Sequence, residues 1–237
     1  MQKPQFTEDN IYHIYNRGVE KRQIFMDKSD YFRFIHDLYE FNDADPVENI
    51  NYYFNPQSDE NHIEVRPRYA KEKKKRKLLV EILAFVAMPN HFHLLMKQVK
   101  NNGIVHFMQK IGTGYTMYFN KKNNRVGGLF QGSFKAILIK DDAHLFHLPF
   151  YIHANPIEIY KGRPSIENHL NFLKNYRWSS YLDYVGIKNF PSITSRGFLT
   201  FYTDMDKEGD NVTSMKDYLK NSNEYLEKLN GVTIDHE

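Results

Sequence analysis

The residues of this chain that could do chemistry, judged by type and spacing, are two histidines and a tyrosine. His91 and His93 lie two positions apart in an apolar run over residues 88–96. If this run is a β-strand, both histidines project from one face, because side chains alternate along a strand. Two imidazoles on one rigid face can hold a single metal ion. An isolated pair of this kind is more often two surface histidines, so the metal interpretation needs a second segment.

The second segment is residues 151–156, Tyr-Ile-His-Ala-Asn-Pro. On a helix, residues four apart share a face, so His147, Tyr151 and Asn155 form one stripe. Placed over the two histidines, Asn155 could offer its side-chain oxygen as a third ligand, with the Tyr151 hydroxyl near whatever the metal binds. A tyrosine with an unperturbed pKa of about 10 needs such a metal to attack a DNA phosphodiester and form a phosphotyrosine. The spacing therefore favours covalent cleavage of DNA followed by rejoining.

Composition limits the other classes of function. The 237 residues include no cysteine, which excludes disulfides, thiolate zinc sites and cysteine catalysis, and fits a reducing compartment. No apolar run approaches the roughly 20 residues that span a bilayer, and the start has no apolar signal region, so we expect a cytoplasmic protein without a membrane partner. The net charge of +3 says little, but residues 66–77 are almost uniformly basic. This run is either a solvated loop or an arm that contacts phosphates.

Hydrophobic periodicity predicts the elements that must position these residues. The predicted strands cover residues 11–18, 78–87, 90–99 and 133–140, and the predicted amphipathic helices cover residues 27–42 and 103–120. The order strand, helix, strand, strand, helix, strand predicts an α+β, ferredoxin-like fold, in which a four-stranded antiparallel sheet carries both helices on one face. Residues 43–77 lack periodicity and are expected to form a long loop or insertion.

A third helix is expected to carry Tyr151. It begins at Asp141, whose carboxylate suits a helix N-terminus, and it ends before Pro156. Pro149 lies inside it and favours a kink, which is either a static bend or a hinge. Residues 164–237 have the pattern of a helical appendage. We therefore expect a catalytic domain over residues 1–163, with a basic insertion at about 43–77, and a C-terminal helical extension over residues 164–237 that packs on or near it.

Four motifs, in this order along the chain, resemble those of a known enzyme family. They are Met-Pro-Asn-His-Phe-His-Leu-Leu at 88–95, Leu-Phe-Gln-Gly-Ser-Phe-Lys at 129–135, Tyr-Ile-His-Ala-Asn-Pro at 151–156 and Trp-Ser-Ser-Tyr at 178–181. The opening Tyr-His-Ile-Tyr-Asn-Arg-Gly at 12–18 fits as well. Together they resemble the single-tyrosine HUH transposases, and within these the REP-associated tyrosine transposases, over about residues 11–184.

The resemblance implies an endonuclease and strand transferase that cuts single-stranded DNA next to a hairpin, leaving a 5'-phosphotyrosine and a free 3'-hydroxyl. It makes His91 and His93 the metal ligands, Asn155 a further ligand from the helix, and Tyr151 the nucleophile. The implied cofactor is Mg or Mn, although imidazoles also suit Zn or Ni, so a bound ion could differ from the working one. Relatives act as homodimers or as monomers, and both stay open here.

Basic residues are the expected contacts with single-stranded or hairpin DNA: Arg17, Lys121, Lys122, Arg125 and Lys135. Two other functions stay open. A metal-dependent hydrolase would need further ligands, and no Asp or Glu near His91 on its strand supplies one. A catalytically silent protein of the same fold would bind hairpin nucleic acid without cutting it. Tyr115 and Tyr118 are expected to belong to the core of the second helix rather than to the site.

Overall fold

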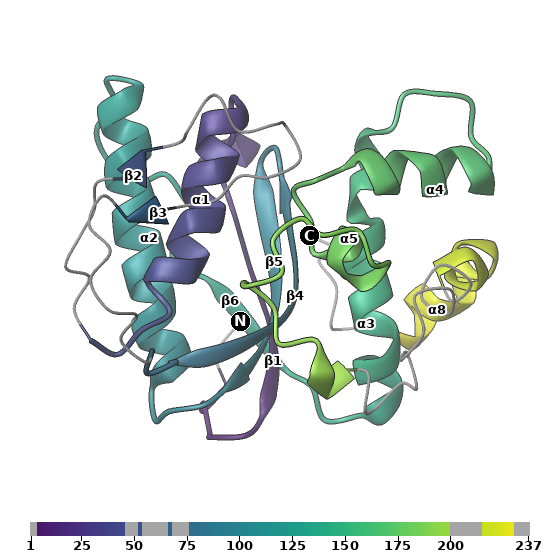
Figure 1. Cartoon of the computed structure of the whole chain (residues 1–237), viewed down its shortest axis with the longest axis horizontal. Helices are drawn as coiled ribbons and strands as arrows, with labels where there is room; N and C mark the ends of the chain where they lie inside the picture. The colour runs from purple at the N-terminus through teal and green to yellow at the C-terminus, as the bar shows by residue number, and fades with distance from the viewer. Residues whose placement is uncertain (1–3, 46–51, 54–65, 68–75, 200–214, 230–237) are drawn as a thin grey trace.

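The helices and strands are arranged in three layers (Figure 1). The computed structural model describes residues 4–45, 52–53, 66–67, 76–199 and 215–229. Helices α1 (Lys28–Glu40) and α2 (Gly103–Lys122) cover one face of a four-stranded sheet. Helix α3 (Asp142–Ala154) covers the other face, together with the helices of the C-terminal part. The sheet therefore separates two apolar cores, one under each layer of helices.

The sheet has the ferredoxin-like strand order. It contains β1 (Ile11–Arg17), β4 (Val80–Met88), β5 (His91–Gln98) and β6 (Lys135–Leu138) in the order β4-β5-β1-β6. Every neighbouring pair is antiparallel. The predicted α+β fold is thus confirmed, with the first two helices on one face. The fourth strand is shorter than the predicted 133–140, because its pairing with β1 covers only residues 135–138.

The predicted insertion over residues 43–77 lies mostly outside the described part of the chain. Within it, β2 (Tyr52–Tyr53) and β3 (Arg66–Pro67) pair as a separate antiparallel ladder. Of the basic run at 66–77, residues 68–75 also lie outside the description. Its end is held by the C-terminus of α1, because Arg76 donates to the Asn42 carbonyl oxygen at 3.1 Å and its guanidinium lies 3.9 Å from the centre of the Tyr39 ring. A cation is favoured at a helix C-terminus.

Side chains of β5 alternate between the two cores. Phe92 and Leu94 lie in the core under α1 and α2, whereas Leu95 lies in the core under α3. Because side chains alternate along a strand, His91 and His93 share the face of Leu95. The two histidines therefore project toward α3, as their spacing predicts.

The chain enters α1 through a capped start. After β1 it turns through the 3-10 helix η1 (Val19–Lys21), and the Asp27 carboxylate then accepts hydrogen bonds from the backbone N–H groups of Ser29 and Asp30. The side chain of Asp30 bonds back to the backbone of Asp27, which completes a capping box. The carboxylates of Asp27 and Asp30 are thereby gathered at one helix end.

Helix α3 is anchored at its start and continues through its proline. The Asp141 carboxylate accepts a hydrogen bond from the Ala143 N–H at 2.7 Å, which satisfies one free donor of the first turn. The helix passes Pro149, which has no N–H to donate, and runs directly into the 3-10 helix η2 (Asn155–Ile159). Buried Leu148 and Ile152 pack in the core under α3. Tyr151 and Asn155 are therefore carried by two consecutive helical segments.

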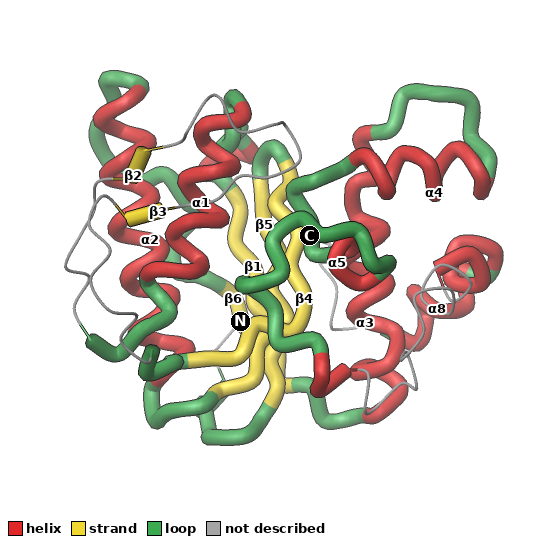
Figure 2. Tube along the Cα trace, viewed as in Figure 1, coloured by secondary structure: helices red, strands yellow, loops and turns green. Residues whose placement is uncertain are grey.

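The C-terminal part packs on the α3 side of the sheet (Figure 2). It includes the helices α4 (Ile166–Asn175), α5 (Tyr181–Tyr184) and α8 (Ser222–Lys228), and residues 215–220 are also helical. Leu173 and Tyr184 belong to the same core as Tyr151, so this extension and α3 share one apolar cluster. The domain boundary at residue 163 stays a prediction. Among the residues with described positions, no helix is long and apolar enough to cross a membrane.

Residues 178–180, which we call the edge segment, run along the open side of β4. The Ala87 N–H donates to the Trp178 carbonyl oxygen at 2.8 Å, and the Ser180 N–H donates to the Phe85 carbonyl oxygen at 3.0 Å. The Trp178 ring stacks on the Tyr31 ring of α1 with a centroid distance of 4.5 Å. The edge segment therefore ties the C-terminal extension to both the sheet and the first helix layer.

Candidate functional site

The structure brings His91, His93 and Asn155 together at the start of β5. His91 Nε2 lies 3.2 Å from Asn155 Oδ1, although the residues are 64 positions apart in the sequence. The His91 and His93 rings are perpendicular neighbours with a centroid distance of 5.1 Å. Asn155 is buried at the first position of η2. The tight turn between β4 and β5 and the junction between α3 and η2 thus place the three side chains together.

Both ring nitrogens of His91 face amide oxygens. Nδ1 lies 2.7 Å from Asn90 Oδ1, and Nε2 lies 3.2 Å from Asn155 Oδ1. The Asn155 amide is oriented by its other end, because Nδ2 donates to the Tyr151 carbonyl oxygen at 3.1 Å. A neutral imidazole has one N–H and can donate to only one of the two oxygens. The lone pair of its other nitrogen then points at a lone pair of an amide oxygen, and the two repel each other. A cation bound between these two atoms would stabilise the arrangement.

His93 is enclosed by aromatic neighbours. Its Nδ1 lies 2.8 Å from Nε2 of His13, a residue of β1, and it is 1% exposed. Its Nε2 is buried and has no hydrogen-bond partner among the described residues. Burial lowers the pKa of His93 well below 6.5, and the neighbouring His13 and His91 rings lower it further. The ring is therefore neutral at physiological pH and keeps a lone pair for a ligand.

These donors fit a divalent cation. The 3.2 Å between His91 Nε2 and Asn155 Oδ1 is close to the roughly 3 Å expected between adjacent ligands of one octahedral ion. The orphaned Nε2 of His93 supplies a further nitrogen donor. Over the described ranges, no group of three or more His, Cys, Asp or Glu side chains could hold a metal, so a site here depends on the amide oxygen. Imidazole nitrogens suit Zn, Ni and other transition metals, and the amide oxygen suits Mg and Mn.

Tyr151 lies against the histidines. Its ring meets the His93 ring edge to face with a centroid distance of 5.6 Å, and the His13 ring with a centroid distance of 6.3 Å. It is 5% exposed and lies in the core under α3. The structure thus places the predicted nucleophile beside one predicted ligand and four residues before another.

The alternative tyrosines lie on the other side of the sheet. The Tyr115 hydroxyl donates to the Ile24 carbonyl oxygen at 2.6 Å inside the core under α1 and α2, and burial raises its pKa. The Tyr118 hydroxyl bonds to Asp30 at 3.0 Å. The expectation that both belong to the packing of α2 agrees with these contacts.

Two further histidines of α3, His153 and His147, have packing contacts. His153 is 3% exposed, and its Nε2 lies 2.7 Å from Ser180 Oγ. Burial lowers the pKa of His153 to about 3, so the ring is neutral. His147 is half-buried, with its ring against Phe146 at a centroid distance of 5.0 Å. His153 thus contacts the edge segment, and the ring contact of His147 is with its own helix.

Two of the predicted DNA contacts flank the histidines on the same sheet face. Arg17 is paired opposite His91 across β1 and β5, and its Nε donates to Gln131 Oε1 at 2.5 Å. Lys135 of β6 is paired opposite Tyr15, which is itself opposite His93. Directly opposed residues of antiparallel strands point to one face. Arg17 and Lys135 therefore border the candidate site.

The other predicted DNA contacts lie at the C-terminal end of α2. Lys122 contacts the capping carboxylates of α1, with Nζ at 2.7 Å from both Asp27 Oδ2 and Asp30 Oδ1. Burial opposes its charge, but these hydrogen bonds prevail and raise its pKa. Arg125 donates to Asn120 Oδ1 at 2.8 Å, and Lys121 is exposed. Lys122 is thus already engaged by carboxylates, whereas Lys121 has no carboxylate partner among the residues with described positions.

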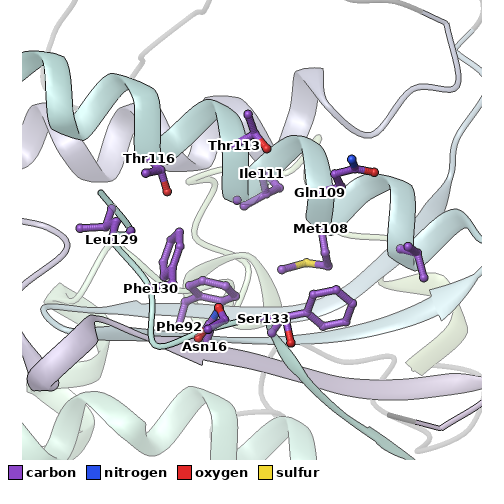
Figure 3. Close-up of a pocket in the computed structure, with 15 residues that line it drawn as sticks. Asn16, Phe92, Met108, Gln109, Ile111, Thr113, Thr116, Leu129, Phe130 and Ser133 are labelled. Atoms are coloured by element: carbon purple, nitrogen blue, oxygen red, sulfur yellow. The ribbon is translucent and has the colours of Figure 1, made fainter. Parts of the chain in front are cut away.

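A hollow of about 510 Å³ lies on the opposite face of the sheet. Figure 3 shows it between α2, which carries Met108, Gln109 and Thr113, and the sheet, which carries Phe92. Phe130 closes it from the loop before β6. Because Phe92 alternates with His91 and His93 along β5, the hollow is separate from the histidine cluster.

Sequence reasoning assigned no role to His13 or Asn90. His13 contacts His93 only because β1 and β5 are neighbours, and that pairing joins residues 80 positions apart. The one available signal is that His13, Tyr15 and Arg17 alternate along β1 and so share a face. Which strand that face would meet cannot be read from β1 alone.

Comparisons with known proteins show similarity of this chain in sequence and in fold. The family model described as "Transposase IS200 like" matches residues 50–155, a stretch that contains all four predicted catalytic and metal-binding residues. Among solved structures, one of a REP-associated tyrosine transposase bound to a REP hairpin is similar, with a TM-score of 0.50 and 12% sequence identity. The similarity covers 80% of this chain and 88% of that chain, and at this identity it shows the fold alone. No curated protein matches the chain.

The sequence match spans the histidines, the tyrosine and the asparagine, and the fold match spans most of the chain. The chain is thus similar in sequence, over residues 50–155, to IS200-like transposases, and similar in fold to a REP-associated tyrosine transposase.

Proposed function

We propose that this protein cuts and rejoins single-stranded DNA next to a hairpin, with Tyr151 as the nucleophile. The match of residues 50–155 to the model of IS200-like transposases supports chemistry on DNA. The solved structure of similar fold carries a REP hairpin, which supports hairpin DNA as the partner here. Arg17 and Lys135, which border the candidate site, are the residues proposed to hold backbone phosphates beside it.

The cleavage step needs only the tyrosine as a covalent participant. The Tyr151 phenol oxygen attacks the phosphorus in line, so that a tyrosine O–P bond forms and the P–O3' bond breaks. The leaving oxygen takes up a proton and becomes a free 3'-hydroxyl, while the 5'-phosphate stays on the enzyme. In the joining step a 3'-hydroxyl attacks the same phosphorus and releases the tyrosine. No external energy source is required, because one phosphoester replaces another at each step.

The proposed metal ligands are His91, His93 and Asn155, which would hold Mg or Mn. When bound, such an ion polarises the scissile phosphate and neutralises charge that develops in the transition state. The protein's own part is to keep the ligands ready. His93 stays neutral because it is buried, and the Asn155 oxygen is directed at His91 because the amide nitrogen is engaged by the Tyr151 carbonyl.

One observation carries the proposal. Asn155 and Tyr151 are joined by the hydrogen bond from Nδ2 to the carbonyl oxygen, and Asn155 Oδ1 lies 3.2 Å from His91 Nε2. The candidate nucleophile and two of the three candidate ligands therefore belong to one contact chain. A structural role alone does not require an amide oxygen to face an imidazole nitrogen.

The proposal is tested by trapping a covalent complex with DNA. The substrate is a single-stranded oligonucleotide that carries an imperfect palindrome from the DNA flanking the gene, labelled at its 3' end and incubated with Mn²⁺. A 5'-phosphotyrosine retains this label on the protein in a denaturing gel, whereas a 5' label leaves with the 3'-hydroxyl fragment. Tyr151→Phe is expected to abolish the adduct, and Tyr160→Phe, which removes a nearby phenol, is expected to retain it.

Two results would contradict the proposal. An adduct of undiminished yield in Tyr151→Phe would assign the nucleophile elsewhere. Tight hairpin binding without any adduct in the unmodified protein would favour the alternative of a catalytically silent hairpin-binding protein of the same fold.

A further inference from the structure

The contact between His13 and His93 has no counterpart in the proposed chemistry. His13 is fully buried on β1, and its Nε2 lies 2.8 Å from His93 Nδ1. The two rings are nearly parallel, with an interplanar angle of 15° and a centroid distance of 5.1 Å. A buried hydrogen bond this short requires that one of the two nitrogens carries the proton and the other accepts it.

The direction of this hydrogen bond decides what His93 can do. If His13 donates, a neutral His93 must carry its proton on Nε2, which then has no acceptor among the described residues. If His93 donates from Nδ1, its Nε2 keeps a lone pair and can bind a cation. A buried N–H without an acceptor costs about 1–3 kcal/mol, whereas a lone pair that meets a cation is satisfied.

His91 is arranged in a parallel way. Its Nδ1 lies 2.7 Å from Asn90 Oδ1 and its Nε2 lies 3.2 Å from Asn155 Oδ1, and the shorter contact favours the proton on Nδ1. Both histidines thus contact a neighbour through Nδ1: His93 contacts His13, and His91 contacts Asn90.

We propose that His13 is a positioning residue that accepts a hydrogen bond from the Nδ1–H of His93 and holds the Nε2 lone pair of His93 ready for the metal ion. Histidine ligands of metals usually donate their second ring N–H to a fixed acceptor, which sets the tautomer and the ring orientation. Here the acceptor is a histidine of the neighbouring strand. Tyr15 and Tyr151 pack against the His93 ring with centroid distances of 5.9 and 5.6 Å, so the ring is also confined sterically.

The inference rests on the proposed metal role of His93, and its first test does not depend on that role. In the metal-free full-length protein labelled with ¹⁵N-histidine, the ring-nitrogen chemical shifts of His93 report which nitrogen carries the proton. The expected result is a proton on Nδ1. A proton on Nε2 would overturn the inference even if the protein cleaves DNA.

The second test measures the affinity of the full-length protein for Mn²⁺ by calorimetry. His13→Phe keeps the ring volume but removes the acceptor, and is expected to weaken binding about 10- to 100-fold. His13→Gln, whose side-chain oxygen can accept near the position of Nε2, is expected to restore most of it. Unchanged affinity in His13→Phe, at a melting temperature that shows it folded, would overturn the inference.

A matched control separates this role from general packing. His153 is a second buried histidine on the same side of the sheet, and His153→Phe is expected to leave Mn²⁺ affinity unchanged. An equal loss in both variants would assign the effect to packing and overturn the inference. If the unmodified protein binds no Mn²⁺, the proposed metal function fails. The inference about His13 is then decided by the first test alone, which measures whether Nδ1 or Nε2 of His93 carries the proton.

Discussion

Two buried histidines on the same side of the sheet, His93 and His153, differ in how their polar atoms are satisfied. Both are neutral because burial lowers their pKa values. The Nε2 of His153 is 2.7 Å from the Ser180 hydroxyl, which in turn accepts the Phe85 N–H at 2.9 Å. The Nε2 of His93 has no partner among the residues the structure describes. Burial alone therefore does not mark a functional histidine, but an unmatched ring nitrogen beside other donors does.

The same distinction applies to the charged residues. Lys122 is bound by two carboxylates, whereas Lys121, its neighbour on α2, is exposed. A charge that already has a partner must lose it before it can bind a phosphate. Polar and charged groups that already have partners are thus expected to contribute to stability. Groups with no such partner are expected to contribute to ligand binding. The following predictions test that division.

The largest effect is expected from removing a ligand-ready histidine. His91→Ala and His93→Ala should each lower the rate of DNA cleavage by about 10²–10³-fold, because transition-state charge would lose its stabilisation. Hairpin affinity should stay within a few fold, since the proposed phosphate contacts are made by other residues. Cleavage is measured on a labelled hairpin oligonucleotide, and affinity by fluorescence anisotropy. Parallel losses in both measurements would indicate misfolding instead.

His153 is expected to control stability in acid rather than catalysis. Its pKa of about 3 in the folded protein lies below the ordinary 6.5, so below pH 6.5 the unfolded chain takes up a proton that the folded chain does not. Stability is then lost as pH falls from about 6.5 toward 3, by up to about 1.4 kcal/mol per pH unit. His153→Gln, which has no titrating ring, should lose stability less steeply in urea unfolding between pH 7 and 4. Parallel curves would contradict the assignment.

The two neighbouring lysines give a matched pair for DNA binding. Lys121→Ala should reduce the slope of log affinity against log salt concentration by about 1, because one phosphate contact is lost. Lys122→Ala should change that slope less, because its ammonium group is bound by Asp27 and Asp30. Arg17→Ala and Lys135→Ala should also reduce the slope, because both cations border the candidate site. Equal slopes in all variants and the unmodified protein would show that these cations do not contact DNA.

The smallest effect is expected when Lys122→Ala removes the contribution of Lys122 to the free energy of unfolding in acid. The hydrogen bond from Lys122 and that from Ser29 lower the pKa of Asp27 to about 2, from 3.8. The pair therefore contributes stability above pH 3.8, which is lost as pH falls toward 2. Because Asp27 is half-exposed, Lys122→Ala should cost only about 0.5–1 kcal/mol at pH 5. The difference in unfolding free energy should shrink between pH 4 and 2, and a difference independent of pH would contradict this account.

Local patterns predicted most of the fold and the proximity of the candidate site residues. Alternation on β5 placed His91 and His93 on one face, and the four-residue spacing of Tyr151 and Asn155 placed them one turn apart. The contacts that went unpredicted join distant segments. The hydrogen bond between His13 and His93 depends on strand register, and the pairing of Lys122 with Asp27 depends on how α2 crosses the start of α1. Periodicity predicts the face of a helix or strand on which a residue lies, but not which other element packs against that face.

The edge segment has a consequence for how the protein is made. The hydrogen bonds between Phe85 and Ser180 join residues 95 positions apart. During translation, β4 is therefore an unpaired edge strand until the C-terminal part has left the ribosome. An open, apolar edge strand is a template for aggregation. Once residues 178–180 have paired with it, β4 is unavailable to a second copy of the chain, and a continuous sheet between two copies would have to form through β6. A chain truncated before residue 178 keeps all four strands of the sheet but lacks the edge segment. It is therefore expected to accumulate in inclusion bodies.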